Sequence, residues 1–254
     1  MRDRRLEAAL AADEIEIRFQ PQIDPASGRI RGVEALARWA EVTSPEALFA
    51  RAVAAGLAER LSRTIQRKAL RLVAGWDGVL GELTVSLNIL PQDLDRPGFD
   101  SWLLSEIALA GLDPHRITAE IIESALLLDR PAVAERLDAL RARGVKVAVD
   151  DFGTGYANLV YLTSLPLDAI KIDRAMVANL VGRERDRIVV KAMIAMANEL
   201  GLKVVVEGIE SIDQLDLIAG WGVDLYQGFL GAGALDVTEL TRFVTSINSR
   251  ADAA

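Results

Sequence analysis

The stretch Val147-Ala148-Val149-Asp150-Asp151 is a short apolar run that ends on two carboxylates. Five further runs also end on a residue that can bind a metal or act in catalysis. They are Val85-Ser86-Leu87-Asn88, Ile117-Thr118-Ala119-Glu120, Ala169-Ile170-Lys171, Val204-Val205-Val206-Glu207 and Leu225-Tyr226-Gln227. If these runs are parallel strands of one sheet, their last residues meet at one rim. We expect that rim to gather four carboxylates, two amides and one ammonium, a set that repels itself without added cations.

The order of the strands predicts a barrel. Strand starts are expected at Ile15, Ile30, Thr84, Ile117, Lys146, Ala169, Lys203 and Leu225. The link from Pro21 to Arg29 is too short for a helical crossover, so the first two strands, Ile15 to Gln20 and Ile30 to Leu36, are expected to be antiparallel neighbours. Eight strands with interleaved helices predict an α/β fold, a (βα)8 TIM-like barrel with one antiparallel strand.

Helical patterns fill most of the connections between these strands. They cover Ser44 to Ala55, Leu57 to Trp76, Gly98 to Ala110, Pro131 to Arg143, Arg185 to Leu200, Ile212 to Ala219 and Val237 to Ile247. We expect residues 1–13 to form a linker-like helix (Arg4 to Ala12) and residues 14–247 to form the barrel. Residues 248–254 are small and polar and are expected to form a flexible tail.

Composition narrows the function classes. The 254 residues, 51% of them hydrophobic, suffice for one large core. No apolar run approaches the ~18 residues of a membrane span, and cysteine is absent, so we expect a cytoplasmic segment without a membrane span. The net charge of -8 argues against binding of a nucleic-acid polymer. The only histidine, His115, precedes a strand start, which argues against Ser-His-Asp chemistry.

The side chains at the rim favour a hard divalent cation. Carboxylate and amide oxygens suit Mg²⁺ or Mn²⁺, whereas zinc normally recruits His or Cys. The candidate ligands are Glu34, Asn88, Glu120, Asp150, Asp151 and Glu207. Two adjacent aspartates allow Asp150 to bridge a metal pair while Asp151 binds one metal. Such a metal pair can activate a water molecule for attack on a phosphoryl group. Lys171 would then orient this water or offset negative charge on the phosphate.

Other interpretations of the same residues are weaker. An acid at a strand end is often a helix cap or turn residue, but six such positions in register are harder to explain this way. Asp151-Phe152-Gly153 resembles the metal-binding triplet of kinases, yet no other kinase motif accompanies it. Gly153-Thr154-Gly155 suggests a dinucleotide fingerprint, but Asn158 stands where the third glycine belongs.

Seven motifs in order and spacing resemble the EAL-domain cyclic di-GMP phosphodiesterase family. They are Glu34-Ala35-Leu36-Ala37-Arg38, Asn88, Glu120-Ile121-Ile122-Glu123-Ser124, Asp150-Asp151-Phe152-Gly153-Thr154-Gly155-Tyr156, Lys171-Ile172-Asp173, Glu207-Gly208-Ile209-Glu210 and Gln227-Gly228. The match runs from about Glu14 to Leu235. The resemblance implies hydrolysis of cyclic di-GMP to linear pGpG by two-metal activation of water, in a barrel with one reversed strand.

The resemblance also implies a role for each matched position. The first metal would be held by Glu34, Asn88, Glu120 and Asp150, and the second by Asp150 and Asp151. Glu207 would be a metal or water partner and a candidate general base. The catalytic residues would be Lys171, which would hydrogen-bond the attacking water, together with Glu207 and Glu34.

Further positions would bind substrate or support the rim. Arg38 would contact a substrate phosphate, although a salt bridge at the barrel mouth is an alternative, and Gln227 would support the site. Glu123 would brace the loop from Phe152 to Tyr156, which in the family connects the metal site with the dimer interface. Asp173 and Glu210 are expected to position loops rather than to take part in the chemistry.

The family also implies cofactors and partners. We expect two Mg²⁺ or Mn²⁺ ions per site, inhibition by Ca²⁺, and a homodimer. Because the first helix resembles a linker, an upstream sensory or diguanylate cyclase-like domain is also expected.

Some segments depart from the family pattern. The segment Ala52 to Ala55 lacks a usual acidic pair, Ala157 and Asn158 replace a serine pair, and Gly231 to Ala234 lacks the usual aromatic and proline. These changes affect rim shape and substrate affinity, whereas every matched metal position is retained, so an active enzyme is predicted. Two alternatives stay open: a catalytically silent cyclic di-GMP receptor or interaction module, and another barrel enzyme such as a lysine-based aldolase or metal-dependent lyase.

Overall fold

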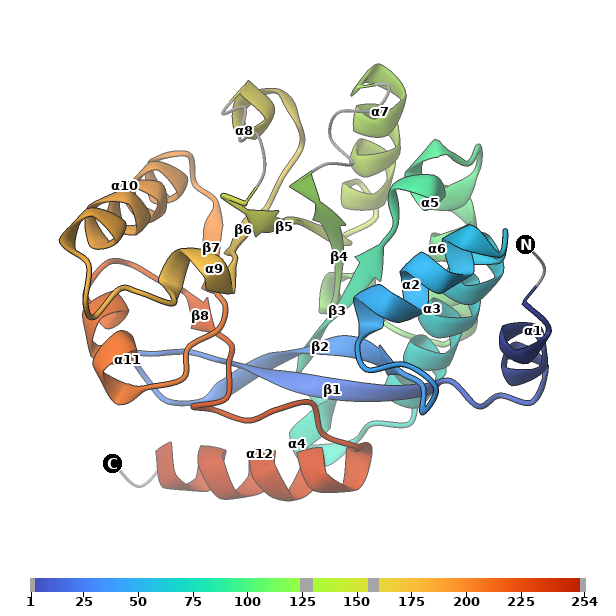
Figure 1. The fold of residues 1–254 in the computed structure, drawn as a ribbon, viewed down its shortest axis with the longest axis horizontal. Coiled ribbons are helices and arrows are strands. Elements are labelled where there is room, and N and C mark those ends of the chain that lie inside the picture. Colours follow the sequence, from blue (N-terminus) through green and yellow to red (C-terminus); the bar gives the residue numbers. More distant parts are fainter. Residues whose placement is uncertain (1–2, 124–129, 155–159, 252–254) are drawn as a thin grey trace.

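A computed structural model of the chain describes residues 3–123, 130–154 and 160–251. Within these residues eight strands close into a barrel in chain order, as Figure 1 shows. The strands are β1 (Glu16–Ile23), β2 (Ile30–Arg38), β3 (Thr84–Ile89), β4 (Ile117–Ile122), β5 (Lys146–Phe152), β6 (Ala169–Ile172), β7 (Lys203–Val206) and β8 (Leu225–Tyr226). The predicted α/β barrel is therefore confirmed.

The reversed strand is β1. It pairs antiparallel with β2 on one side and with β8 on the other, whereas each later pair from β2 to β8 is parallel. The turn between β1 and β2 is held by Asp24, whose side chain accepts hydrogen bonds from the backbone N–H groups of Ala26 and Ser27. The prediction of two antiparallel first strands is confirmed.

Helices surround the barrel, and each expected helical segment is present, with shifts of a few residues at its ends. They are α1 (Arg4–Ala11), α2 (Pro45–Ala54), α3 (Ala58–Ala74), α4 (Gly78–Gly81), α5 (Pro91–Asp95), α6 (Phe99–Leu109), α7 (Arg130–Arg141), α8 (Val160–Ser164), α9 (Arg174–Val177), α10 (Glu184–Glu199), α11 (Ile212–Ala219) and α12 (Val237–Ala251), with a 3-10 turn at Pro114–Arg116. The helices of four or five residues, α4, α5, α8 and α9, were not expected, because one turn carries no hydrophobic period.

The two ends of the chain pack on the barrel. In α1, Leu6 and Ala9 are fully buried, and Asp3 at its N-cap accepts two hydrogen bonds from the Arg51 guanidinium of α2. At the other end, α12 lies across β1 and β2 (Figure 1) and continues to Ala251, four residues beyond the predicted end at Ile247. The segment predicted to be a flexible tail is therefore helical as far as Ala251.

The core follows from the pattern of the strands. In β5, Val147 and Val149 are fully buried, as apolar residues are in a parallel strand covered on both faces. Phe19 of β1 is also fully buried and meets the Trp76 ring edge to face, with the ring centroids 4.8 Å apart. No helix among the described residues is long and apolar enough to cross a membrane.

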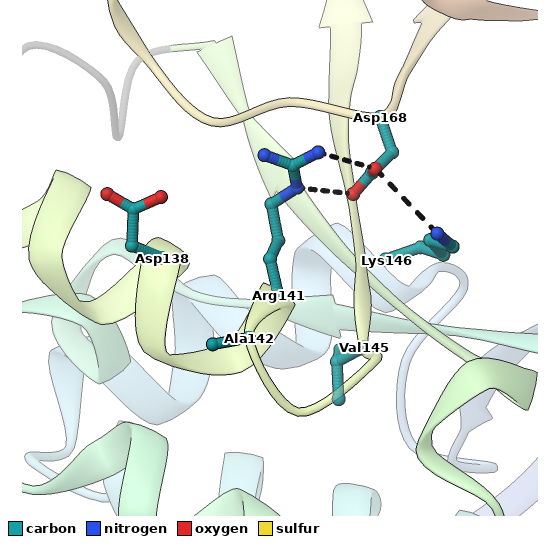
Figure 2. A pocket seen from close by; sticks show the side chains of 6 residues that line it. All are labelled: Asp138, Arg141, Ala142, Val145, Lys146 and Asp168. Atoms are coloured by element: carbon teal, nitrogen blue, oxygen red, sulfur yellow. Dashed lines mark hydrogen bonds and ion pairs between the residues drawn. The ribbon is translucent and has the colours of Figure 1, made fainter.

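A pocket lies at the end of the barrel where β5 and β6 begin (Figure 2). It has a volume of about 410 Å³ and is lined by Asp138, Arg141, Ala142, Val145, Lys146 and Asp168. The Asp168 carboxylate accepts two hydrogen bonds of 2.9 Å from the Arg141 guanidinium and one of 2.9 Å from the Val147 N–H. Because Asp168 ties α7 and β5 to the start of β6, we interpret this end of the barrel as structural.

Candidate active site

The side chains expected at the rim lie at the other end of the barrel, around one lysine. Lys171 is 1% exposed, and its Nζ lies 2.8 Å from Glu120 Oε2 and 2.8 Å from Glu207 Oε1. The same Nζ lies 3.1 Å from Asp150 Oδ1 and 3.3 Å from Glu34 Oε2. Strands β2, β4, β5 and β6 and the residue after β7 therefore bring four carboxylates to one ammonium.

Glu34 of β2 is held from three sides. Its Oε1 accepts a hydrogen bond of 2.8 Å from Asn88 Nδ2, and its Oε2 accepts one of 2.7 Å from Gln227 Nε2 and one of 3.3 Å from Lys171. The Gly228 that follows Gln227 must be glycine, because a Cβ there would lie 2.2 Å from the carbonyl oxygen of Ile209. The orientation of the Glu34 carboxylate is thus fixed by the ends of β3, β6 and β8.

Asp150 and Asp151 both lie at the rim because the pairing of β5 with β6 is irregular at these residues. Successive side chains of a regular strand point to opposite faces, but the β5–β6 pairing shifts register between Val149 and Phe152. Asp151 has a positive φ of 56°, and its N–H donates to Asp150 Oδ1 at 3.0 Å. This local backbone conformation places Asp150 and Asp151 in one cluster.

The cluster holds more negative charge than Lys171 can compensate. Burial raises the pKa of Glu120 well above its usual range, and burial also raises the pKa of Glu207 to about 8. Burial together with the nearby Asp150 raises the pKa of Asp151 to about 6. At Glu34, burial is outweighed by Lys171 and the two amides, so its pKa is lowered. Without further positive charge, some of these carboxyl groups therefore remain protonated near neutral pH.

Two groups of carboxylates have the spacing that a cation requires. Glu34, Glu120 and Asp150 form one group, and Asp150, Asp151 and Glu207 form the other, each with its ligand oxygens within 4.8 Å of one another. Asp150 belongs to both groups. That it bridges two metals stays a prediction. The donor atoms are all oxygens, so the residues present fit Mg²⁺ or Mn²⁺ better than zinc.

Lys171 has the wrong chemistry for a Schiff base. Although burial by itself lowers the pKa of an ammonium, the carboxylates of Asp150, Glu120, Glu207 and Glu34 together raise the pKa of Lys171 well above its ordinary value. A nucleophilic lysine needs the opposite shift, because only the neutral amine attacks a carbonyl. The interpretation as a lysine-based aldolase is therefore disfavoured.

The remaining predicted residues lie around this cluster. Arg38, at the end of β2, is half-buried; in the described part of the chain its guanidinium donates to the Ala37 carbonyl at 2.9 Å and forms no ion pair. Glu123 Oε2 accepts from the Gly153 N–H at 3.4 Å. Asp173 caps α9 by accepting from the Ala175 N–H at 2.8 Å, and the exposed Glu210 donates its backbone N–H to Gln214. Ser124, Tyr156, Ala157 and Asn158 lie outside the described residues.

Sequence reasoning missed two glutamines of β1 that contact the site. Gln20 Oε1 accepts from Gln227 Nε2 at 3.0 Å, and Gln22 Nε2 donates to Gln227 Oε1 at 3.4 Å. The signal was present, since two polar residues spaced by two occupy one face of a strand. Both glutamines lie on the antiparallel strand, away from the ends of the parallel strands that carry the predicted site residues.

Fold and site together define an α/β barrel with an oxygen-lined, acidic site suited to divalent cations. The EAL domain family profile matches residues 3–234, and the chain belongs to this family.

Some curated relatives are named as cyclic di-GMP phosphodiesterases. The chain is 34% identical over 251 residues to the Pseudomonas aeruginosa protein named cyclic di-GMP phosphodiesterase NbdA, covering 95% of this chain and 32% of that protein. It is 30% identical over 230 residues to the bifunctional diguanylate cyclase/cyclic di-GMP phosphodiesterase MucR of the same organism, covering 89% of this chain and 34% of that protein. The chain spans about a third of the length of the curated relatives it matches.

Solved structures show the same fold. The PaMucR phosphodiesterase in its c-di-GMP complex superposes with a TM-score of 0.87 at 29% identity, covering 93% of this chain and 98% of that chain. The Klebsiella pneumoniae BlrP1 manganese/cy-diGMP complex gives a TM-score of 0.79 at 30% identity, covering 87% of this chain and 56% of that chain. The barrel is therefore similar to structures that hold the cyclic dinucleotide, one of them with manganese.

Proposed function

We propose that this chain is a metal-dependent phosphodiesterase that hydrolyses cyclic di-GMP to linear pGpG. The observation that carries the proposal is the pair of carboxylate groups that share Asp150 around the buried Lys171. The names of its relatives and structural neighbours supply the substrate. The reaction adds water across one phosphodiester bond, leaving a phosphate monoester on one side and a hydroxyl group on the other.

The first cation would be held by Glu34, Asn88, Glu120 and Asp150, and the second by Asp150 and Asp151, with Glu207 as a further partner. Two divalent cations supply an activated water and neutralise charge on the phosphate. The all-oxygen donor set favours Mg²⁺ or Mn²⁺, and we propose that Ca²⁺ inhibits.

Two residues of the chain would act on the proton of the attacking water and on the negative charge of the phosphate. Glu207 is the candidate general base for the attacking water. In the metal-free chain burial raises its pKa to about 8, and bound cations would favour the carboxylate form that accepts the proton. Burial opposes the charged form of Lys171, but the surrounding carboxylates raise its pKa in the metal-free chain. As an ammonium, Lys171 would orient that water and offset charge on the phosphate.

Substrate contacts come from the edge of the site. Arg38, with no ion pair among the described residues, is free to bind a phosphate oxygen, and Gln227 holds the Glu34 carboxylate in place. Glu123 would support the loop that begins at Gly153, and Asp173 would position α9.

The assembly around this chain is also a proposal. We propose a cytoplasmic homodimer joined to an upstream sensory or diguanylate cyclase-like domain. Relatives named as a bifunctional cyclase/phosphodiesterase and as the oxygen sensor protein DosP support the additional domain.

The test is a product assay. Purified protein is incubated with cyclic di-GMP in Mg²⁺, Mn²⁺ or Ca²⁺, and the products are separated by chromatography, with Glu34→Ala as the matched variant. We expect pGpG with Mg²⁺ or Mn²⁺ and none with Ca²⁺ or with the variant. Nucleotide binding without pGpG under every metal condition would replace the enzyme by the receptor alternative.

A further inference from the structure

A buried polar network connects α3 to the end of β3. Its members are Ser62 and Gln66 of α3 and Asp93 of α5, each 1% exposed. Ser62 Oγ donates to Asp93 Oδ2 at 2.5 Å, and Gln66 Nε2 lies 3.0 Å from Ser62 Oγ and 3.3 Å from Asp93 Oδ2. None of these residues was singled out from the sequence, and none is among the candidate ligands.

The network holds the backbone on both sides of Ile89. Gln66 Nε2 donates to the carbonyl oxygen of Asn88 at 3.2 Å, and the Leu90 N–H donates to Asp93 Oδ2 at 3.2 Å. The amide must present its nitrogen here, because the Asn88 carbonyl can only accept. The backbone that carries the Asn88 side chain is therefore anchored to α3 and α5.

We propose that Gln66 is a positioning residue for the metal site. By holding the Asn88 carbonyl, it aims the Asn88 amide at Glu34, whose Oε1 lies 2.8 Å from Asn88 Nδ2. The proposal rests on the proposed function, since Asn88 and Glu34 are assigned there as ligands of one cation. Residues that orient ligands from outside typically change metal affinity by about 10–100-fold.

Gln66 has a second buried polar atom. Its Oε1 is buried and has no hydrogen-bond partner in the part of the chain that the structure describes. Replacing Gln66 by methionine, which has a similar length, removes this unpaired acceptor but leaves the Asn88 carbonyl without its donor. The variant also loses the Nε2 contacts with Ser62 Oγ and Asp93 Oδ2, so it should lose stability as well as the support of Asn88. A control that loses a buried glutamine away from the site is therefore needed to separate the two effects.

A matched control lies on α11. Gln214 is also a buried glutamine, and its Nε2 donates to the carbonyl oxygen of Val177 at 3.2 Å. Its Oε1 accepts from the backbone N–H groups of Glu210 and Ser211, and it contacts no candidate ligand. Gln214→Met should therefore lower stability without changing metal affinity.

The experiment measures Mn²⁺ affinity by calorimetry, without substrate, in the whole chain and its variants. We expect Gln66→Met to weaken Mn²⁺ binding about tenfold and Gln214→Met to leave it unchanged. In a cycle with Asn88→Ala, the double variant should bind no more weakly than Asn88→Ala alone, because both changes remove one contribution. Ser62→Ala, a milder change to the same network, should weaken binding in the same direction.

Unchanged Mn²⁺ affinity in Gln66→Met, or effects that multiply in the double variant, would overturn this inference and leave the proposed function standing. If Gln66→Met does not fold, Ser62→Ala with wild-type affinity would overturn it equally. A wild-type chain that binds no Mn²⁺ would overturn the proposed function, and this inference with it.

Discussion

The carboxylates at the two ends of this barrel differ in how much positive charge lies beside them. At the end where the strands begin, Asp168 is matched by the Arg141 guanidinium and by a backbone N–H of β5 (Figure 2). At the end where the strands finish, Glu34, Glu120, Asp150 and Glu207 share the single ammonium of Lys171. The Asp168 carboxylate is neutralised by a cation of the chain itself. The carboxylates around Lys171 exceed the positive charge beside them, so they need added cations.

We expect the end at which the strands begin to contribute to stability, and the end at which they finish to contribute to chemistry. A carboxylate that accepts hydrogen bonds from an arginine and a backbone N–H stabilises the fold, so its removal lowers the free energy of unfolding. A buried cluster with excess negative charge destabilises the metal-free fold, but it is the arrangement that binds divalent cations strongly. Substitutions at the two ends should therefore have effects of different kinds.

The largest effect is expected at the rim. Glu34→Gln keeps the shape of the side chain but removes one of the proposed anionic ligands, so the proposed turnover of cyclic di-GMP should fall roughly 10³-fold, equivalent to about 4 kcal/mol. Steady-state kinetics measure this loss, with the exposed Glu16→Gln on β1 as the control at wild-type rate. Turnover of Glu34→Gln within tenfold of wild type would contradict the assigned role.

The next effect is expected at the opposite end. Asp168→Ala leaves Arg141 and the Val147 N–H without their shared acceptor, so the free energy of unfolding in urea should fall by about 3 kcal/mol. Turnover at a temperature where the variant is folded should stay within about twofold of wild type. Asp138→Ala in the same pocket removes a charge that acts on Arg141 without a hydrogen bond between the two side chains, so it should cost less than Asp168→Ala. A variant of Asp168 that keeps its stability but loses activity would reverse our assignment of the two ends.

The stability of the metal-free chain should depend on pH because of the carboxyl groups at the rim. The pKa of Glu207 in the folded chain is about 8 and that of Asp151 about 6, both above their ordinary values of 4.5 and 3.8. The folded chain then holds more protons than the unfolded chain between pH 4 and 8, so stability falls as pH rises through this window. We expect a loss of about 2 kcal/mol from pH 6 to pH 8, measured by urea unfolding with a chelator.

Glu207→Gln is the control for this pH effect, because an amide does not titrate and the slope should become shallower. The lowered pKa of Glu34 contributes with the opposite sign, but only below its ordinary value of 4.5. Stability that is constant or rises between pH 6 and pH 8 would show that the rim does not carry excess charge.

The smallest effect is expected at Arg38. Arg38→Ala should raise the KM for cyclic di-GMP about tenfold, or about 1.4 kcal/mol, by removing a charged hydrogen bond to phosphate. Mn²⁺ affinity should not change, because Arg38 contacts none of the carboxylates. Arg31→Ala, at the start of the same strand, should leave KM unaltered, and equal effects of the two variants would argue for general electrostatics instead of contact.

The sequence predicted the barrel and most of the rim because both depend on short-range patterns. An apolar run such as Val204 to Val206 followed by Glu207 identifies a strand and its working end together. The resemblance of the motifs to one family then assigned roles to these strand ends. The register of neighbouring strands in a barrel brings these ends together, so no long-range information was needed.

Other features depend on three-dimensional contacts. The register shift that turns Asp150 and Asp151 to one site needs knowledge of the β5–β6 pairing. Gln66 contacts Asn88 across 22 positions of sequence, within a helix that otherwise shows an ordinary apolar face. The helix through Ala251 was missed because small polar residues at a chain end resemble a frayed tail.

The most direct test of the contrast between the two ends locates manganese itself. Crystals grown with Mn²⁺ should show anomalous scattering at the rim, between Glu34, Glu120 and Asp150 and between Asp150, Asp151 and Glu207, and none beside Asp138 and Asp168. Scattering at the Asp168 pocket, or a rim in which Lys171 keeps all four carboxylates and no manganese is bound, would contradict the account.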